Sequence, residues 1–173
     1  MSRTRMLSWR RVWIVVGGLL IATSAVVTGM GLGLLPAPFA DDVARAHVTI
    51  SDENGRVSAT VEARVADTPR ERYRGLSDAE RLRNGIGMLF VFEQEAERTF
   101  VMRDMDFPLD IIFIGADNRI TQIYHAPVPP PNTTEQELTP YRGRAKWVLE
   151  VPRGYAERYN ISTGDVVDIT YTE

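Results

Sequence analysis

Asp104, Asp106 and Asp110 stand within seven residues of one another near the middle of the chain. Carboxylates at this spacing can bind a hard cation through oxygen, or act as an acid and base pair where burial separates their pKa values. The segment is not a standard calcium loop, because Leu109 stands where such a loop has glycine and Gly115 where it has glutamate. We therefore favour a turn whose aspartates accept hydrogen bonds from backbone N–H groups, with Asp110 opening a strand.

Arg74 and Glu150 form a second candidate site. A guanidinium such as that of Arg74 can clamp a carboxylate or phosphate ligand. Glu150 stands inside the apolar segment 148–151, where a charge needs either a solvent-facing side or a partner. We therefore favour a structural ion pair between Arg74 and Glu150, with ligand binding as the alternative.

His125 follows a strand-like segment and precedes a proline-rich loop. Its unperturbed pKa lies near neutrality, as a general base requires, but no convincing nucleophile accompanies it. We favour a surface or capping histidine, and the catalytic residues, if any, remain unknown. The residues predicted to contact a ligand are Arg74, Asp104, Asp110, His125, Tyr141 and Glu150.

The composition excludes several kinds of chemistry. The 173 residues contain no cysteine and two histidines, which removes disulfides, thiolate metal sites and cysteine nucleophiles and nearly excludes a multi-histidine metal site. The sequence has no phosphate-binding loop and no dinucleotide fingerprint. We therefore predict no metal and no cofactor.

The charges divide the chain into two parts. Four of the 20 basic residues lie within residues 1–40, which contain no acid, so 16 basic and 23 acidic residues remain beyond them, with a net charge of −7. An acidic domain does not attract a phosphate backbone, and we predict no nucleic-acid partner.

Residues 12–35 are 24 residues without a charge. As a helix they would reach roughly 36 Å, enough to cross a bilayer core of about 30 Å. Arginines precede this span and acids follow it, so the positive-inside bias predicts a cytoplasmic tail (residues 1–11), a transmembrane anchor (12–35), a linker (36–45) and an exported domain (46–173). The alternative is a cleaved signal sequence, which exports the same domain.

Strand patterns dominate the exported part. Residues 57–65 alternate strictly between apolar and polar and should form a hairpin with residues 47–50 through Asn54-Gly55. Thr68 should cap a short helix that ends at Gly75.

Further strands are predicted at 88–92, 99–103, 109–114, 119–124, 145–151 and 166–171, with a turn at 93–97, a long loop at 127–141 and a helical turn at 154–159. About eight short strands with one or two short helices predict a mainly β fold, a compact jelly-roll-like sandwich or barrel.

Six motifs occur together in a fixed order: Arg74-Gly75-Leu76, GMLFVF at 87–92, Phe100 with Met102, PLDIIF at 108–113, VLE at 148–150 and Gly164-Asp165. Over roughly residues 46–172 this set resembles the domain of unknown function 192 family, small and usually exported proteins of bacteria and archaea. The resemblance implies one compact, jelly-roll-like β domain and no established activity. Ser77 and Arg103-Asp104 depart from residues common in the family, as does the absence of cysteines from the proline-rich loop.

We expect a membrane-anchored binding or interaction module rather than an enzyme. Its contact surfaces would be the loop 127–141 and the neighbourhood of Arg74, Asp110 and Glu150. One alternative is a hydrolase or transferase for envelope material that uses Asp104, Asp106 or Asp110 together with Glu150, which requires the two carboxylates to face one cleft. The other is an accessory subunit of a membrane complex, bound through an exposed apolar patch.

Overall fold

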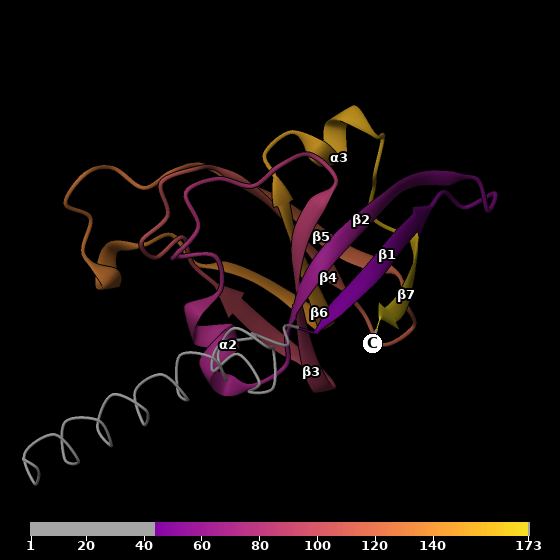
Figure 1. The fold of residues 1–173 in the computed structure, drawn as a ribbon, viewed down its shortest axis with the longest axis horizontal. Coiled ribbons are helices and arrows are strands. Elements are labelled where there is room, and N and C mark those ends of the chain that lie inside the picture. Colours follow the sequence, from indigo (N-terminus) through magenta and orange to yellow (C-terminus); the bar gives the residue numbers. More distant parts are fainter. Residues whose placement is uncertain (1–43, 173) are drawn as a thin grey trace, which may run out of the picture. The chain divides into compact units, whose positions relative to one another are not determined.

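About half of residues 44–172, which are the residues that the computed structural model describes, lie in strands. Seven strands and three short helical segments follow one another along this part of the chain (Figure 1). The strands are β1 (Arg45–Ser51), β2 (Val57–Ala66), β3 (Ile86–Phe100), β4 (Leu109–Ile114), β5 (Ile120–Ala126), β6 (Tyr141–Pro152) and β7 (Val166–Thr172). The helical segments are α2 (Pro69–Arg74), the 3-10 turn η1 (Glu135–Glu137) and α3 (Tyr155–Arg158).

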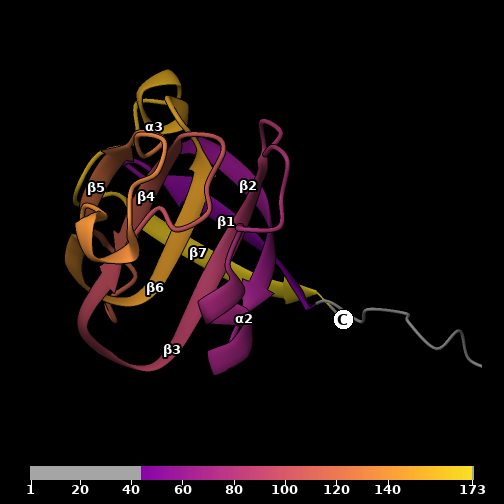
Figure 2. The same ribbon diagram turned by 90° about the vertical axis from the view of Figure 1, so that its left-hand side faces the viewer.

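The strands form one sheet in the order β5-β4-β6-β3-β2-β1-β7. The sheet curls strongly, so that β1 and β7 run across the direction of β3 and β6 (Figure 2). Its two edges touch at one end, where Arg119 and Val166 form an isolated bridge and the Ile120 N–H donates to the Asp165 carbonyl at 3.0 Å. The mainly β fold is confirmed, but the sheet is single and not closed, in place of the predicted sandwich or barrel.

The central strands are buried on both faces. All six residues of β4 are buried, whereas residues in the middle of β2 alternate between buried and exposed. Because successive side chains of a strand point to opposite faces, β4 and β6 contribute to two separate cores. The first core contains Val48, Val61, Leu89, Ile112 and Leu149. The second contains Phe90, Met102, Ile111, Phe113 and Val148.

The connection from β2 to β3 positions the first helix. These two strands are parallel, and the other neighbouring pairs are antiparallel. A parallel pair requires a crossover, and α2 lies in it. Thr68 and Glu71 form the predicted capping box, and Gly75 ends the helix at a φ of +52°. The helix predicted between Thr68 and Gly75 is confirmed, as is the hairpin between β1 and β2.

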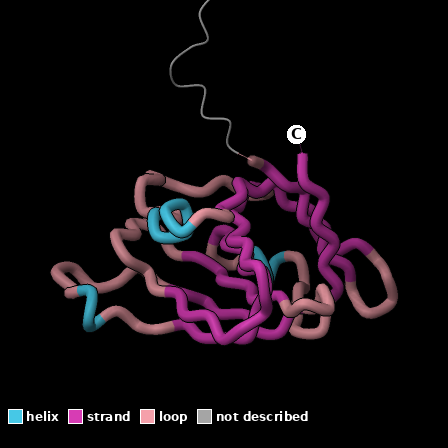
Figure 3. Tube along the Cα trace, turned by 90° about the horizontal axis from the view of Figure 1, so that it is seen from below, coloured by secondary structure: helices cyan, strands magenta, loops and turns pink. Residues whose placement is uncertain are grey.

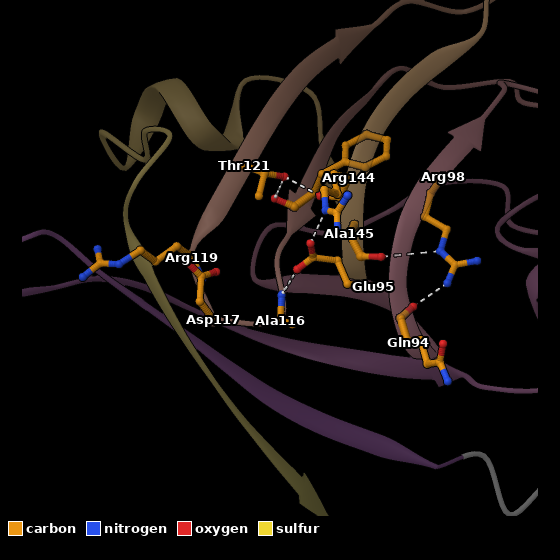
Figure 4. A network of polar contacts seen from close by, with 10 residues as sticks. Gln94, Glu95, Arg98, Ala116, Asp117, Arg119, Thr121, Arg144 and Ala145 are labelled. Atoms are coloured by element: carbon orange, nitrogen blue, oxygen red, sulfur yellow. Dashed lines mark hydrogen bonds and ion pairs between the residues drawn. The ribbon is translucent and has the colours of Figure 1, made fainter.

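Strand β3 corrects two predictions. Residues 93–97 are not a turn, because β3 continues through them with an irregular register between Val91 and Ala96, and the strand predicted at 99–103 is instead the end of β3. Glu95 holds the irregularity in place: its carboxylate accepts hydrogen bonds from the Ala116 N–H at 2.5 Å and from the Arg144 guanidinium (Figure 4). Glu95, the middle acid of the run that suggests a turn, is therefore paired with residues far along the chain.

Helices α2 and α3 lie toward opposite ends of the sheet (Figures 1 and 2). The proline-rich loop predicted after residue 126 is confirmed, and it extends away from the strands with η1 inside it (Figure 3). The transmembrane anchor predicted at 12–35 lies outside the described residues. Within residues 44–172, no helix has the length and apolar character needed to span a bilayer.

Candidate ligand-binding site

A cavity of about 300 Å³ lies where α2, the start of β3 and the segment after β3 meet. The crossover places α2 beside β3, and Gly75 lets the chain turn directly against an aromatic ring. A Cβ at this position would make ordinary contact with the ring of Phe90 at 3.4 Å, so it is the φ of +52° that favours glycine here. The cavity is lined mainly by apolar side chains, among them Leu76, Phe90, Phe100, Met102, Met105 and Leu109.

Glu150 supplies the single carboxyl group of the cavity wall. Its strand neighbours are Met88 on β3 and Ile111 on β4, and its residue surface is 6% exposed. Within residues 44–172 the carboxyl has neither a hydrogen-bond partner nor an ion pair, and burial alone raises the pKa of Glu150 to about 8. Every fully enclosed side-chain nitrogen or oxygen in this part of the chain has a hydrogen-bond partner. Because the Glu150 carboxyl has none, its oxygens are not fully enclosed and reach the cavity that the residue lines. At neutral pH the group is mostly protonated, and it presents one O–H donor and one carbonyl acceptor.

Arg74 lies on the cavity wall. It does not form the ion pair with Glu150 that the sequence predicts. Its Nε lies 3.3 Å from the Asp78 carboxylate, one helical turn further along the chain, and both side chains are at least half exposed. The predicted pair is wrong because the two carboxyls differ in access: Asp78 lies in solvent beside the guanidinium, whereas Glu150 lies on the inner wall. Exposed pairs of this kind contribute about 0–1 kcal/mol.

Two further arginines line the cavity, and each is already held. Arg103 pairs with Glu135 at 3.0 Å, and its guanidinium lies 3.9 Å from the centre of the Tyr73 ring. Arg72 donates to the Val91 carbonyl at 2.9 Å and packs over the Phe92 ring. The wall therefore carries three arginines and one uncharged acid. Arg72 and Arg103 are held by several contacts, whereas Arg74 has only the exposed pair with Asp78 among the described residues.

Asp110 and His125 lie together, but away from this cavity. Asp110 is fully buried, and its carboxylate meets His125 Nδ1 at 2.7 Å, the Arg153 guanidinium at 3.4 Å and the Ala156 N–H at 2.9 Å. Asp110 pairs in register with Val151, which belongs to the first core, whereas Glu150 pairs with Ile111 of the second core. The two acids therefore point to opposite faces of the sheet, and Asp110 ties α3 to β4.

The three aspartates do not converge. Asp104 and Asp106 are exposed and line a groove that adjoins the cavity and also contains the prolines at 129–131, while Asp110 is buried elsewhere. Asp104 adopts a φ of +53°, as a turn residue does. No group of three acidic or histidine side chains within residues 44–172 is placed to hold a metal ion, so the cation site considered for this cluster is not formed.

Tyr141 begins β6, opposite Phe100, and does not line the cavity. Its ring lies 5.4 Å from that of Tyr124, and burial raises the pKa of its hydroxyl. The phenylalanines and methionines of the cavity wall belong to the second core or pack against it. The sequence signal of the cavity is Glu150 of β6, an acid that stands between apolar residues with no charged neighbour.

Comparisons with known proteins assign the chain to a family. Residues 49–169 match the model of the domain of unknown function 192 (DUF192) family, described as an uncharacterized ACR. The chain belongs to the DUF192 family. The match covers every strand from the middle of β1 to the middle of β7 and includes the whole cavity wall.

Solved structures agree with this DUF192 assignment. A protein of unknown function from Novosphingobium aromaticivorans DSM 12444 is 32% identical, with a TM-score of 0.64 over 78% of this chain and 92% of that one. A protein from Sinorhizobium meliloti 1021, provisionally named a transcription regulator, is 27% identical, with a TM-score of 0.64 over 73% of this chain and 95% of that one. No curated protein matches the sequence significantly.

Proposed function

We propose that this DUF192 protein is a binding module exported to the outside of the cell membrane, and that its domain holds a small molecule in the cavity beside Glu150. The observation that carries the proposal is the lone carboxyl. It is 6% exposed and faces the cavity, without a hydrogen-bond partner in the described chain. A buried carboxyl with no partner destabilises a fold, so its presence on a cavity wall indicates that a ligand supplies the missing partner.

The apolar lining supports the same proposal. Small-molecule sites are concave and mostly apolar, with a few polar groups that fix the ligand's orientation. Phe90, Phe100 and Met102 supply the apolar wall here, and Glu150 and Arg74 supply the polar groups. The volume of about 300 Å³ lies at the lower end of the range for ligand sites.

The hydrolase alternative lacks a second carboxylate beside Glu150. Glycoside chemistry needs two carboxylates facing one cleft about 5–10 Å apart. Asp110 faces the opposite side of the sheet from Glu150, and Asp104 and Asp106 are exposed in a different groove. Glu150 therefore has no acidic partner in its cavity.

The membrane placement rests on the uncharged span 12–35, with basic residues before it and acids after it. The net charge of −7 beyond residue 40 also argues against a nucleic-acid partner, so the provisional name of the Sinorhizobium relative is not extended to this chain. Protease added to intact cells should digest the domain. Full protection in intact cells and digestion after lysis would overturn the proposed location.

Binding can be tested by NMR on the full chain in lipid nanodiscs, labelled with ¹³C in the methionine methyl groups. A fragment library containing acids, amines and neutral compounds would be screened. Ligands of the cavity should shift the methyl signals of Met102 and Met105, which line it, and leave the Ala156 amide of a ¹⁵N-labelled sample, on the opposite side of the sheet, nearly unchanged. If no compound of any charge shifts Met102 or Met105, the proposed function is wrong.

A further inference from the structure

The cavity beside Glu150 has a polarity gradient. Three guanidiniums, those of Arg72, Arg74 and Arg103, line it together with the apolar wall, and Tyr73 and Glu150 are the other ionisable residues. All three arginines come from α2 or from the segment after β3, whereas Glu150 comes from β6. The positive charges and the single carboxyl group therefore come from different elements around the cavity.

The positive side of the cavity favours an anion. Among the described residues Arg74 pairs only with Asp78, at 3.3 Å, with side-chain exposures of 51% and 77% for the two residues. Such a pair is weak, so a ligand carboxylate or phosphate can replace Asp78 as the partner of the guanidinium without a large loss. A ligand cation would instead meet three like charges before it reached the one acid.

The acidic side of the cavity favours a hydrogen-bond acceptor. Ionised Glu150 would need a nearby cation, and neither an ion pair nor a hydrogen bond to it is formed by the described chain. In an apolar wall the carboxyl therefore stays protonated and offers an O–H. A carbonyl or hydroxyl oxygen on the ligand satisfies that donor and adds no charge.

We infer that the ligand class is a small amphipathic organic anion. Its acid group pairs with Arg74, its apolar or aromatic body packs against Phe90 and Phe100, and an oxygen at its far end accepts a hydrogen bond from Glu150. This inference rests on the proposed function. The cavity volume of about 300 Å³ limits the body to about one ring or a short chain.

A matched set of probes tests the charge preference. The compounds 3-phenylpropanoate, 3-phenylpropan-1-ol and 3-phenylpropan-1-amine share one body and carry an anion, a neutral group and a cation at pH 7. Each would be titrated into the full chain in nanodiscs while the methyl signals of Met102 and Met105 are followed. We expect the anion to bind about tenfold more tightly than the amine, as one charge-assisted hydrogen bond would give.

Variants assign the two ends of the probe. Arg74→Gln should weaken binding of 3-phenylpropanoate about tenfold and leave the alcohol unchanged, whereas Arg64→Gln, at an exposed position on β2, should change neither. The probe 3-(4-hydroxyphenyl)propanoate should bind severalfold more tightly than 3-phenylpropanoate, and Glu150→Leu should abolish that gain. An unchanged Ala156 amide signal, on the opposite side of the sheet from Glu150, shows that each variant keeps its fold.

The outcomes separate the two proposals. If the amine or the alcohol binds as tightly as the anion, or if Arg74→Gln behaves like Arg64→Gln, the ligand class is wrong while the proposed binding function stands. If no probe shifts Met102 or Met105 and the wider library is also silent, both proposals are wrong. A preference for the anion that depends on Arg74, together with a hydroxyl gain that depends on Glu150, supports both.

Discussion

Asp110 and Glu150 are two buried acids on neighbouring antiparallel strands, and they differ in their hydrogen-bond partners. Asp110 has three partners, two of them side chains and one a backbone N–H. Glu150 has none in the described chain, and burial raises its pKa to about 8. The contrast shows that burial of an acid does not by itself indicate a role. An acid with every partner in place holds the fold together, and an acid without partners beside a cavity is the one that we propose to bind a ligand.

The sequence surroundings of the two acids are nearly the same. Leu109 and Ile111 flank Asp110, and Leu149 and Val151 flank Glu150. The difference arises because side chains alternate along a strand and because β4 and β6 are buried on both faces. Each acid must therefore find its partners on its own side of the sheet, and only the side with α3 provides them.

The largest expected effect comes from removing the partnered acid. Asp110→Ala should lower the free energy of unfolding by about 4 kcal/mol, because the Ala156 N–H and two side-chain donors lose their acceptor in a buried place. Urea unfolding measures the change. Asp106→Ala, an exposed aspartate of the same segment, should change stability by less than about 0.5 kcal/mol. Equal losses in the two variants would contradict the anchoring role.

The unpartnered acid should give the protein an inverted pH dependence. Glu150 is protonated in the folded state up to about pH 8 but ionises near 4.5 when unfolded, so unfolding releases a proton between these values. Stability should therefore fall by about 3 kcal/mol from pH 5 to pH 8 and level off above that. Glu150→Gln should flatten this decline, as measured by urea unfolding across the range.

Other carboxyl groups affect stability at acidic pH and must be separated from Glu150. Hydrogen bonds lower the pKa values of Glu71, Glu95 and Glu137, and each of these groups loses its stabilising contribution as the pH falls below about 4.5. Their effect lies outside the range from pH 5 to pH 8. The difference between wild type and Glu150→Gln in that range thus isolates one carboxyl, and identical slopes would show that Glu150 is not protonated in the folded protein.

A smaller effect should follow from crowding the strand that carries Glu150. A Cβ on Gly87 would lie 2.8 Å from the Glu150 carbonyl oxygen and 2.9 Å from a Val61 methyl group. Gly87→Ala should therefore destabilise the protein by about 2 kcal/mol, through a shift of β3 against β6. Because Val61 belongs to the first core, the Ala156 amide, on the same side of the sheet, should move more in NMR spectra than the Met102 and Met105 signals of the second core. The reverse pattern would contradict the separation of the two sides.

The smallest effect should come from one partner of Asp110. His125→Ala removes a single hydrogen bond of 2.7 Å from a carboxylate that keeps Arg153 and the Ala156 N–H, and it should cost about 1 kcal/mol in urea unfolding. His47→Ala, on the exposed side of β1, is the matched control. A loss as large as that of Asp110→Ala would mean that the histidine, rather than the aspartate, organises this region.

Local features were predictable from the sequence where neighbours along the chain cause them. The capping box at Thr68 and the end of α2 at Gly75 need only a few adjacent residues, and the hairpin needs the alternation of β2 and the turn at Asn54-Gly55. The turn predicted at 93–97 failed because Glu95 finds its partners in segments far along the chain. The Arg74–Glu150 pair failed for a related reason, since the guanidinium has an acid one helical turn away.

The sequence alone determined most of the strand segments, helices α2 and α3, the family and the set of residues able to do chemistry, because side-chain periodicity and turn chemistry act over a few residues. Only the tertiary structure decided the parallel pairing of β2 with β3, the single open sheet and the cavity that results. It also decided which buried acid is partnered. Register and strand order assign each side chain to a face, and residues far apart in the chain then determine whether its charge is compensated.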